Sequence, residues 1–184
     1  KPGTHYKYND VRVNVLAYSL LNIFREPLPR ILKNNIMDNI GASNTWRWYG
    51  YDNSWVNMDG QWIQSVSGGG HSGGGMFINT LDHARFGLLF LSNGNWNGKQ
   101  LISKEWIKKA TTPSNTNSSY GYMWWLNNPK GERFVKNTSS KIYFAAGFGG
   151  NYIVVIPDKN IVVVTRWLEP KKLNEFIERL YKLI

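Results

Sequence analysis

The sequence predicts an α/β (α+β) fold in which helices flank an antiparallel sheet, and three observations predict it. Two apolar, β-branched runs, residues 152–156 and 161–165, are separated by the turn-forming residues 157–160, which is the pattern of a hairpin. Neither run alternates with polar residues, so each strand is expected to be covered on both faces. Helical periodicity before and after the hairpin supplies the covering layers.

Length and composition limit the classes of protein that fit. The 184 residues contain no linker-like stretch, which favours one domain with one sizeable core. No run of eighteen apolar residues and no charged-then-apolar leader occurs, so we expect no membrane span. Cysteine is absent, and His5, His71 and His83 lack zinc-ligand spacing. We therefore expect neither a metal nor a cofactor.

The net charge of +10 raises the question of an anionic partner. The 22 basic residues are spread along the chain, and no helix-turn-helix, zinc-finger or RNP pattern accompanies them. The charge therefore indicates a solvated surface, and no nucleic-acid partner is expected. The nine Trp and ten Tyr residues are unusual in number. At this density aromatic side chains can line a pocket for sugars or other flat substrates, although most are expected in the core and sheet.

The first predicted element is a helix that follows a turn. Asp10 is expected to cap it, and it is expected to end near Arg25 because two prolines follow. Its spacing predicts an apolar face made of Leu16, Leu20, Ile23 and Phe24. A second helix is expected to open at Pro29 and to stop at Gly41.

An aromatic, turn-rich region and a glycine-rich segment follow. Within residues 45–66, Asp59-Gly60 signals a tight turn between short strands. Residues 67–75 hold six glycines, but the phosphate-binding pattern GxxxxGK[ST] is absent, so nucleotide binding is not expected. The glycines instead predict a backbone that passes close to other elements. A helix capped by Thr80 is expected next.

The last third of the chain holds the hairpin and a terminal helix. Ser103 is expected to cap a helix that runs through Ala110, and residues 120–126 alternate loosely as a strand. Small residues over 145–150 allow another backbone or a ligand to approach, so function is expected at that edge. A helix from about Pro170 carries an apolar stripe that should pack onto the sheet: Leu173, Phe176, Ile177, Leu180, Leu183 and Ile184.

Five segments occur together in the order found in a known family. They are PGT at 2–4, YND at 8–10, GGGMF at 73–77 with ARFG at 84–87, NG at 97–98 with LIS at 101–103, and residues 144–157. In this order the chain resembles the serine β-lactamase-like superfamily, above all its class C type, with penicillin-binding esterases, D-Ala-D-Ala peptidases and 6-aminohexanoate-dimer hydrolases. The resemblance implies a β-lactamase/transpeptidase-like fold and makes residues 1–184 the C-terminal part of a single serine hydrolase domain.

The family's nucleophile motif, Ser-x-x-Lys, has no counterpart here, because no Ser is followed by Lys three residues later. The family places this motif upstream of its Tyr motif. The resemblance therefore implies an upstream N-terminal segment that carries Ser-x-x-Lys, either on a separate chain or removed, and the start at Lys1 agrees with a processed or truncated product. The chain alone is expected to be inactive.

The family's second motif, Tyr-x-Asn, corresponds to Tyr8-Asn9-Asp10. The resemblance makes Tyr8 the general base, with a pKa lowered by a neighbouring Lys. Asp10 replaces the amide with a carboxylate that is able to pair with that Lys. Helix cap and catalytic partner both remain open for Asp10, and the two roles are compatible.

The third motif, Lys-Thr-Gly or a His variant, corresponds to Ala145-Ala146-Gly147. Ala145 lacks the cation that binds a substrate carboxylate, which favours an ester or amide without that anion. The resemblance assigns the backbone N–H of Phe148 to the oxyanion hole and Ala145 and Gly147 to substrate binding. His71, between glycines, is either a substrate-binding residue or a hydrogen-bonded structural one.

The implied function is serine hydrolysis of an ester, amide or peptide-like bond through an acyl-enzyme, on a small-molecule or peptide-like substrate. The alternative is a non-catalytic relative, or an aromatic-rich module that binds glycans or peptides. Ala145 and the missing Ser-x-x-Lys are consistent with it. Composition leaves the compartment open, whereas the resemblance favours an extracytoplasmic location, periplasmic or secreted.

Overall fold

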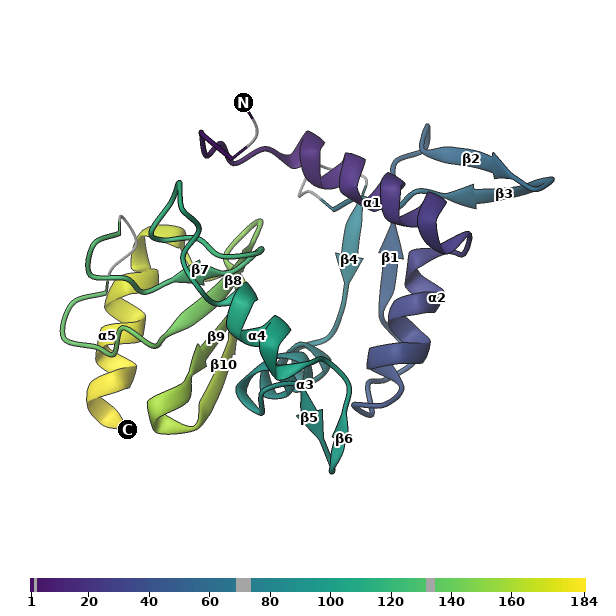
Figure 1. Cartoon of the computed structure of the whole chain (residues 1–184). Coiled ribbons are helices and arrows are strands. Elements are labelled where there is room, and N and C mark those ends of the chain that lie inside the picture. The colour runs from purple at the N-terminus through teal and green to yellow at the C-terminus, as the bar shows by residue number, and fades with distance from the viewer. Residues whose placement is uncertain (2, 69–73, 132–134) are drawn as a thin grey trace. The chain divides into compact units, whose positions relative to one another are not determined.

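The structure is a computed structural model that describes residues 1, 3–68, 74–131 and 135–184. The chain divides into two compact units, which are labelled by element in Figure 1. We call Lys7–Asp82 the N-terminal unit, and Lys1–Tyr6 with His83–Ile184 the sheet unit. All strand pairs between described residues are antiparallel, and helices accompany them in both units. The predicted fold class is confirmed. Across the described residues, every helix is too short or too polar to cross a bilayer.

The N-terminal unit contains two helical segments and two small sheets. Strands β1 and β4 pair in one sheet, and β2 and β3 pair in the other. Its elements are α1 (Asp10–Phe24), α2 (Leu28–Leu32), a π-helical turn (Lys33–Met37), β1 (Arg47–Tyr49), β2 (Trp55–Met58), β3 (Gln61–Gln64) and β4 (Gly75–Phe77). The Asp59-Gly60 turn between β2 and β3 is confirmed, because both residues have the positive φ angles of a tight hairpin turn, 54° and 82°.

Helix α1 ends where predicted, but its N-cap and its buried face differ from the prediction. Asn9, not Asp10, is the N-cap, since its side chain accepts the backbone N–H of Arg12 at 3.3 Å. Asp10 is the first helical residue, so the prediction that it caps the helix is wrong. The predicted apolar face is wrong for three of its four residues, since only Leu20 packs against a buried cluster. The buried positions are Ala17 and Leu21, whereas Leu16, Ile23 and Phe24 are exposed.

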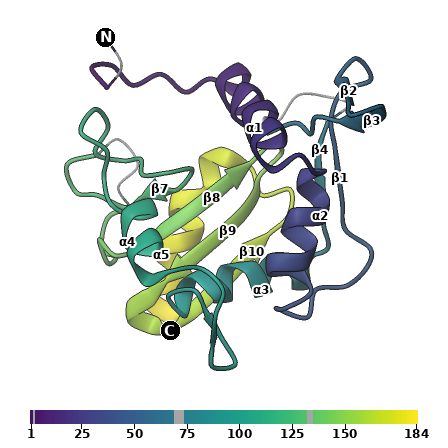
Figure 2. The same ribbon diagram turned by 45° about the vertical axis from the view of Figure 1, so that its right-hand side comes forward.

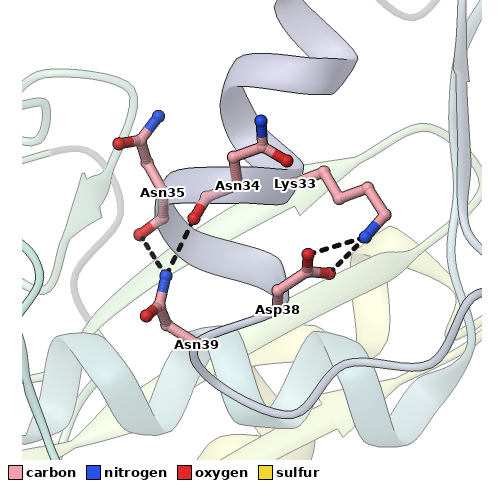
Figure 3. A network of polar contacts seen from close by, with 5 residues as sticks. All are labelled: Lys33, Asn34, Asn35, Asp38 and Asn39. Atoms are coloured by element: carbon pink, nitrogen blue, oxygen red, sulfur yellow. Dashed lines mark hydrogen bonds and ion pairs between the residues drawn. The ribbon is translucent and has the colours of Figure 1, made fainter.

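The predicted second helix changes pitch after one turn. The backbone N–H of Asp38 donates to the carbonyl of Lys33, five residues back, and the two side chains form an ion pair. The side-chain amide of Asn39 donates to the carbonyls of Asn34 and Asn35, at 2.9 and 3.1 Å (Figure 3). Because Asn side chains compete for helix carbonyls, this Asn-rich stretch widens and then ends the helix.

A buried carboxylate anchors the start of α3 (Thr80–Leu91). Asp82 is fully buried and accepts the backbone N–H of Ser43 at 3.1 Å and the side-chain amide of Asn79 at 2.6 Å. The side chain of Asn79 accepts the backbone N–H of Asp82 at 2.8 Å in return. Asn79 therefore caps the helix, and the prediction that Thr80 does so is wrong, since Thr80 is already helical.

The sheet unit is built around a four-stranded antiparallel sheet in the order β10-β9-β8-β7. In Figure 2, α5 lies against one face of this sheet, and α3 and α4 lie on the other. The elements are β5 (Asn95–Trp96), β6 (Lys99–Gln100), α4 (Lys104–Ala110), β7 (Trp125–Leu126), β8 (Tyr143–Gly147), β9 (Asn151–Ile156), a 3-10 turn (Pro157–Lys159), β10 (Ile161–Thr165), a second 3-10 turn (Pro170–Lys172) and α5 (Leu173–Leu183).

Two hydrophobic clusters cover the two faces of β9. Ile153 and Val155 pack with Phe90 of α3 and Ile107 of α4, whereas Val154 and Ile156 pack with Ile177 and its neighbours on α5. The prediction of a hairpin strand buried on both faces is confirmed for β9. Both faces of β10 are also covered, by Val162 in the first cluster and Ile161 and Val163 in the second, but its residues are only half-buried because it is the edge strand of the described sheet.

The remaining local predictions are mostly confirmed. Ser103 caps α4, accepting the N–H of Trp106 at 3.1 Å. The stripe of α5 packs onto the sheet through Leu173 and Ile177, although Leu183 is 84% exposed and Ile184 is also exposed. Only two residues of the expected strand over 120–126 form β7. Of the other residues, Tyr120 forms an isolated bridge with Trp125, and residues 121–123 form a bend.

Candidate functional site

The end of β8 brings three predicted site residues together. Ala145 pairs with Ile153, and Gly147, the last residue of the strand, pairs with Asn151 of β9. On the other side, β7 pairs only with the first two residues of β8. Within the described residues, Ala145 and Gly147 therefore lie on a stretch of backbone with a strand along one side only. An extended substrate can approach such an open edge.

Phe148 directly follows the end of β8 and is an exposed residue. Its side chain is 82% exposed, and its carbonyl accepts the side-chain amide of Asn151 at 2.6 Å. Its backbone N–H has no hydrogen-bond partner among the described residues. A peptide held through its carbonyl with its N–H unpaired is suited to bind an oxyanion.

Two glycines and the chain after β10 fix this peptide. Gly149 and Gly150 have φ angles of 73° and 78°, which favour glycine. A Cβ on Gly150 would lie 1.7 Å from the carbonyl oxygen of Leu168, and one on Gly149 would lie 2.5 Å from the ring of Trp167. The backbone N–H of Leu168 donates to the carbonyl of Gly150 at 3.2 Å. The prediction that small residues allow another backbone to approach is confirmed here.

Tyr8 and Asp10 belong to the N-terminal unit, whereas Ala145, Gly147 and Phe148 belong to the sheet unit. Tyr8 immediately precedes the N-cap of α1, and its side chain is 53% exposed. Asp10 lies in the first helical turn, where the helix dipole favours a negative charge. The role of Asp10 as the partner of a catalytic Lys remains a prediction.

Helix α1 also holds the start of the glycine-rich segment, a contact that the sequence analysis missed. The side-chain oxygen of Asn14 accepts the backbone N–H of Gly68 at 2.9 Å. A Cβ on Gly68 would lie 2.5 Å from Cγ1 of Val13, so close packing requires glycine there, as predicted. His71 lies outside the described residues.

His83 of α3 is the titratable group with the largest lowering of pKa within the described sheet unit. Burial, and secondly the positive charge of Arg166, lower the pKa of His83 to about 4. Its Nδ1 atom is buried without a hydrogen-bond partner in the described part of the chain. His83 is therefore neutral at pH 7. Among the described residues, no group of three or more His, Asp or Glu side chains is arranged to hold a metal ion.

Comparison with known proteins identifies the fold. A 6-aminohexanoate-dimer hydrolase, so named provisionally, from Bacillus anthracis is 19% identical with a TM-score of 0.68, over 98% of this chain and 44% of its own. A beta-lactamase of Mycobacterium bovis is 18% identical to this chain, with a TM-score of 0.68. The alignment covers 100% of this chain and 64% of the Mycobacterium protein. A provisionally named beta-lactamase of Bacteroides dorei is 13% identical to this chain, with a TM-score of 0.63. The alignment covers 90% of this chain and 52% of the Bacteroides protein.

These likenesses establish the fold, and the chain spans from 44% to 64% of the length of the three solved structures. No curated protein sequence matches it. A sequence model of a protein family, described as Beta-lactamase, matches residues 1–167 of this chain. The whole N-terminal unit and most of the sheet unit lie inside that match. The chain belongs to the beta-lactamase family.

Proposed function

We propose that the chain supplies the C-terminal part of a single serine hydrolase domain, which cleaves an ester, amide or peptide-like bond through an acyl-enzyme. The observation that carries this proposal is the backbone N–H of Phe148 at the end of β8, which no described residue pairs, in a member of the beta-lactamase family. A fixed N–H stabilises the negative charge that develops on the substrate carbonyl oxygen in the transition state. A backbone donor serves this purpose whatever the side chain.

Tyr8 is the general base in this proposal. A phenol has an ordinary pKa near 10, so it needs a neighbouring cation to accept a proton near neutral pH. The cation is the Lys of the Ser-x-x-Lys motif, and the carboxylate of Asp10 pairs with that Lys. The half-exposed side chain of Tyr8 supports a role that requires access to substrate.

The nucleophile comes from an upstream N-terminal segment, since no Ser of this chain has Lys three residues later. That segment also covers apolar side chains of α1. The exposure of Leu16, Ile23 and Phe24 supports this arrangement, because a helix of a folded domain rarely leaves several such side chains in water.

The preferred substrate is a small-molecule or peptide-like ester or amide without a terminal carboxylate. Ala145 offers a methyl group where a carboxylate-binding site needs a cation. Gly147, exposed and without a side chain, lets the substrate backbone approach β8. The assignment of His71 as a further substrate-binding residue rests on the sequence alone.

The test uses the full-length protein and p-nitrophenyl esters. Tyr8→Phe is expected to lower kcat by about 100-fold or more, as for a lost general base, with unchanged stability. Tyr18→Phe, on a similarly exposed tyrosine of α1, is the matched control and should leave kcat unchanged. A fluorophosphonate should label a Ser upstream of Lys1. An unchanged kcat for Tyr8→Phe would refute its role, and a label within residues 1–184 would refute the upstream nucleophile.

A non-catalytic module that binds glycans or peptides is the second candidate. It is favoured by one observation, the parallel stacking of two half-exposed rings, Trp106 and Tyr122, with centroids 5.6 Å apart and planes inclined by 3°. Sugar rings bind to such exposed aromatic faces. This candidate predicts no phosphonate labelling and no turnover, together with glycan binding that Trp106→Ala abolishes.

A further inference from the structure

The net charge of the protein is concentrated in the sheet unit. The N-terminal unit contains six basic and six acidic residues, whereas the sheet unit contains sixteen basic and six acidic ones. On α5, Glu175 and Glu178 pair with basic neighbours and neutralise part of this charge. Helix α4 has three lysines and one glutamate in seven residues. The excess of positive charge therefore lies largely away from α5.

A cavity of about 690 Å³ opens between α4, the end of α3 and the start of β8. Its volume is in the range of small-molecule sites. Phe90, Ile107, Leu126 and Tyr143 line it, and these side chains belong to the cluster that packs on this face of the sheet. Figure 2 shows α4 crossing that face near β8. The floor of the cavity is therefore apolar.

The rim of this cavity is cationic. Lys104 and Lys108 come from successive turns of α4, and Lys141 comes from the segment that leads into β8. All three are exposed, and no carboxylate is found among the described residues that line the cavity. None of the three side chains makes an ion pair or hydrogen bond with a described residue. Their charges are open to a ligand.

Tyr143 adds a hydrogen-bond donor at the floor. Its side chain is only 7% exposed, and its ring packs edge-on against Trp124 with centroids 5.1 Å apart. Its hydroxyl group makes no hydrogen bond to a described residue, so it is available to a ligand. Burial raises the pKa of Tyr143 well above its ordinary value, so the hydroxyl remains a donor.

We propose that this cavity binds an amphipathic anion, that is, a phosphate, sulfate or carboxylate group attached to an apolar body. The three lysines hold the head group, the hydroxyl of Tyr143 donates a hydrogen bond to it, and the apolar body lies against Phe90, Ile107 and Leu126. A purely polar polyanion would leave the floor unfilled, and a neutral apolar ligand would leave the lysines unpaired.

This site is separate from the acyl-transfer site proposed above. Tyr143 begins β8, whereas Gly147 ends it and Phe148 follows. Four residues of extended chain span roughly 13 Å. The proposal therefore does not depend on hydrolytic activity, and it holds equally for a non-catalytic relative.

Calorimetric titration of the full-length protein with monomeric octyl phosphate tests the proposal. Inorganic phosphate supplies the charge alone, and octyl glucoside supplies the tail with a neutral head. Octyl phosphate should bind at least tenfold more tightly than either. Affinity should rise about fourfold for each methylene that is buried, and it should fall as salt is raised, because the rim charges are exposed. Octyl phosphate binding no tighter than inorganic phosphate would overturn the proposal.

Variants localise the binding. Lys104→Gln, Lys108→Gln and Lys141→Gln combined should weaken octyl phosphate binding at least tenfold, and Tyr143→Phe should weaken it several-fold with an unchanged melting temperature. Lys109→Gln is the matched control, since Lys109 lies beside Lys108 but does not line this cavity. Equal losses from Lys109→Gln and Lys108→Gln would show binding to net charge alone and would refute the site.

Discussion

The two units bury their apolar side chains to very different extents. In the sheet unit, every residue of β9 from Tyr152 to Ile156 is buried, between one cluster on α5 and another on α3 and α4. In the N-terminal unit, Ile23, Trp62 and Phe77 are all more than half exposed, and each described sheet has two strands only.

The difference shows that strong hydrophobic patterning does not by itself produce a closed core. A strand covered on both faces obtains its layers from segments that are near in sequence, here β8, β10 and α5. An exposed apolar helix such as α1 has no such partner among the described residues for part of its surface. The sheet unit should therefore behave as the stable part of the chain, and three predictions test this comparison.

The largest expected loss of stability comes from truncating a buried side chain in the cluster that packs α5 against the sheet. Ile177 is 0% exposed, so Ile177→Ala should lower the free energy of unfolding by about 2 to 5 kcal/mol. Ile23 is 71% exposed, and Ile23→Ala should change it by less than about 0.5 kcal/mol in the same chain. Urea denaturation followed by circular dichroism measures both. Similar losses for the two variants would abolish the distinction between the units.

A smaller effect, confined to the sheet unit, should appear on acidification. An unperturbed His has a pKa of 6.5, whereas the pKa of His83 in the folded unit is about 4. Between these values the unfolded chain binds a proton that the folded unit does not, so stability is present above pH 6.5 and falls as the pH drops towards 4. The expected loss at pH 4.5 is about 2 kcal/mol.

Thermal melts from pH 7 to 4.5 measure this loss. His83→Asn should make stability depend less steeply on pH, whereas His5→Asn, at an exposed position, should leave the pH dependence of stability unchanged. A dependence equally steep in the His83 variant would mean that other groups cause it.

The smallest effect compares one helix cap from each unit. Asn9→Ala and Ser103→Ala each remove a side-chain acceptor for a backbone N–H, at a cost of about 1 kcal/mol. Hydrogen exchange should show the loss of protection only in the unit that carries the substitution. If Asn9→Ala lowers protection in β8 and β9 as well, the two units unfold as one, and the comparison must be abandoned.

Much of the sheet unit was predictable because its signals are local. The hairpin requires only two apolar runs and the turn between them, and Ser103 precedes its helix with the expected spacing. The N-terminal unit was harder. Asn9 and Asp10 are both good caps, one residue apart, and sequence alone does not choose between them. Helix α1 has apolar residues on all sides, so its pattern does not select a buried face.

The candidate site was predictable to a similar degree. The glycines around Phe148 marked a place of close approach, and the family motifs pointed to Tyr8 and to the end of β8. The contact between Asn14 and Gly68 was not predictable, because it joins residues 54 positions apart and no local pattern encodes it. The amphipathic cavity was missed for the same reason, since its lysines come from two separate segments.

The packing of Trp167 and Leu168 against Gly149 and Gly150 has a consequence for anyone who alters this protein. The connection between β10 and α5 forms the wall of the turn that holds Phe148. Directed evolution that randomises Gly149 or Gly150 will therefore yield few clones in which this turn keeps its shape. A graft of a different C-terminal helix will preserve the turn only if it keeps the Trp-Leu pair.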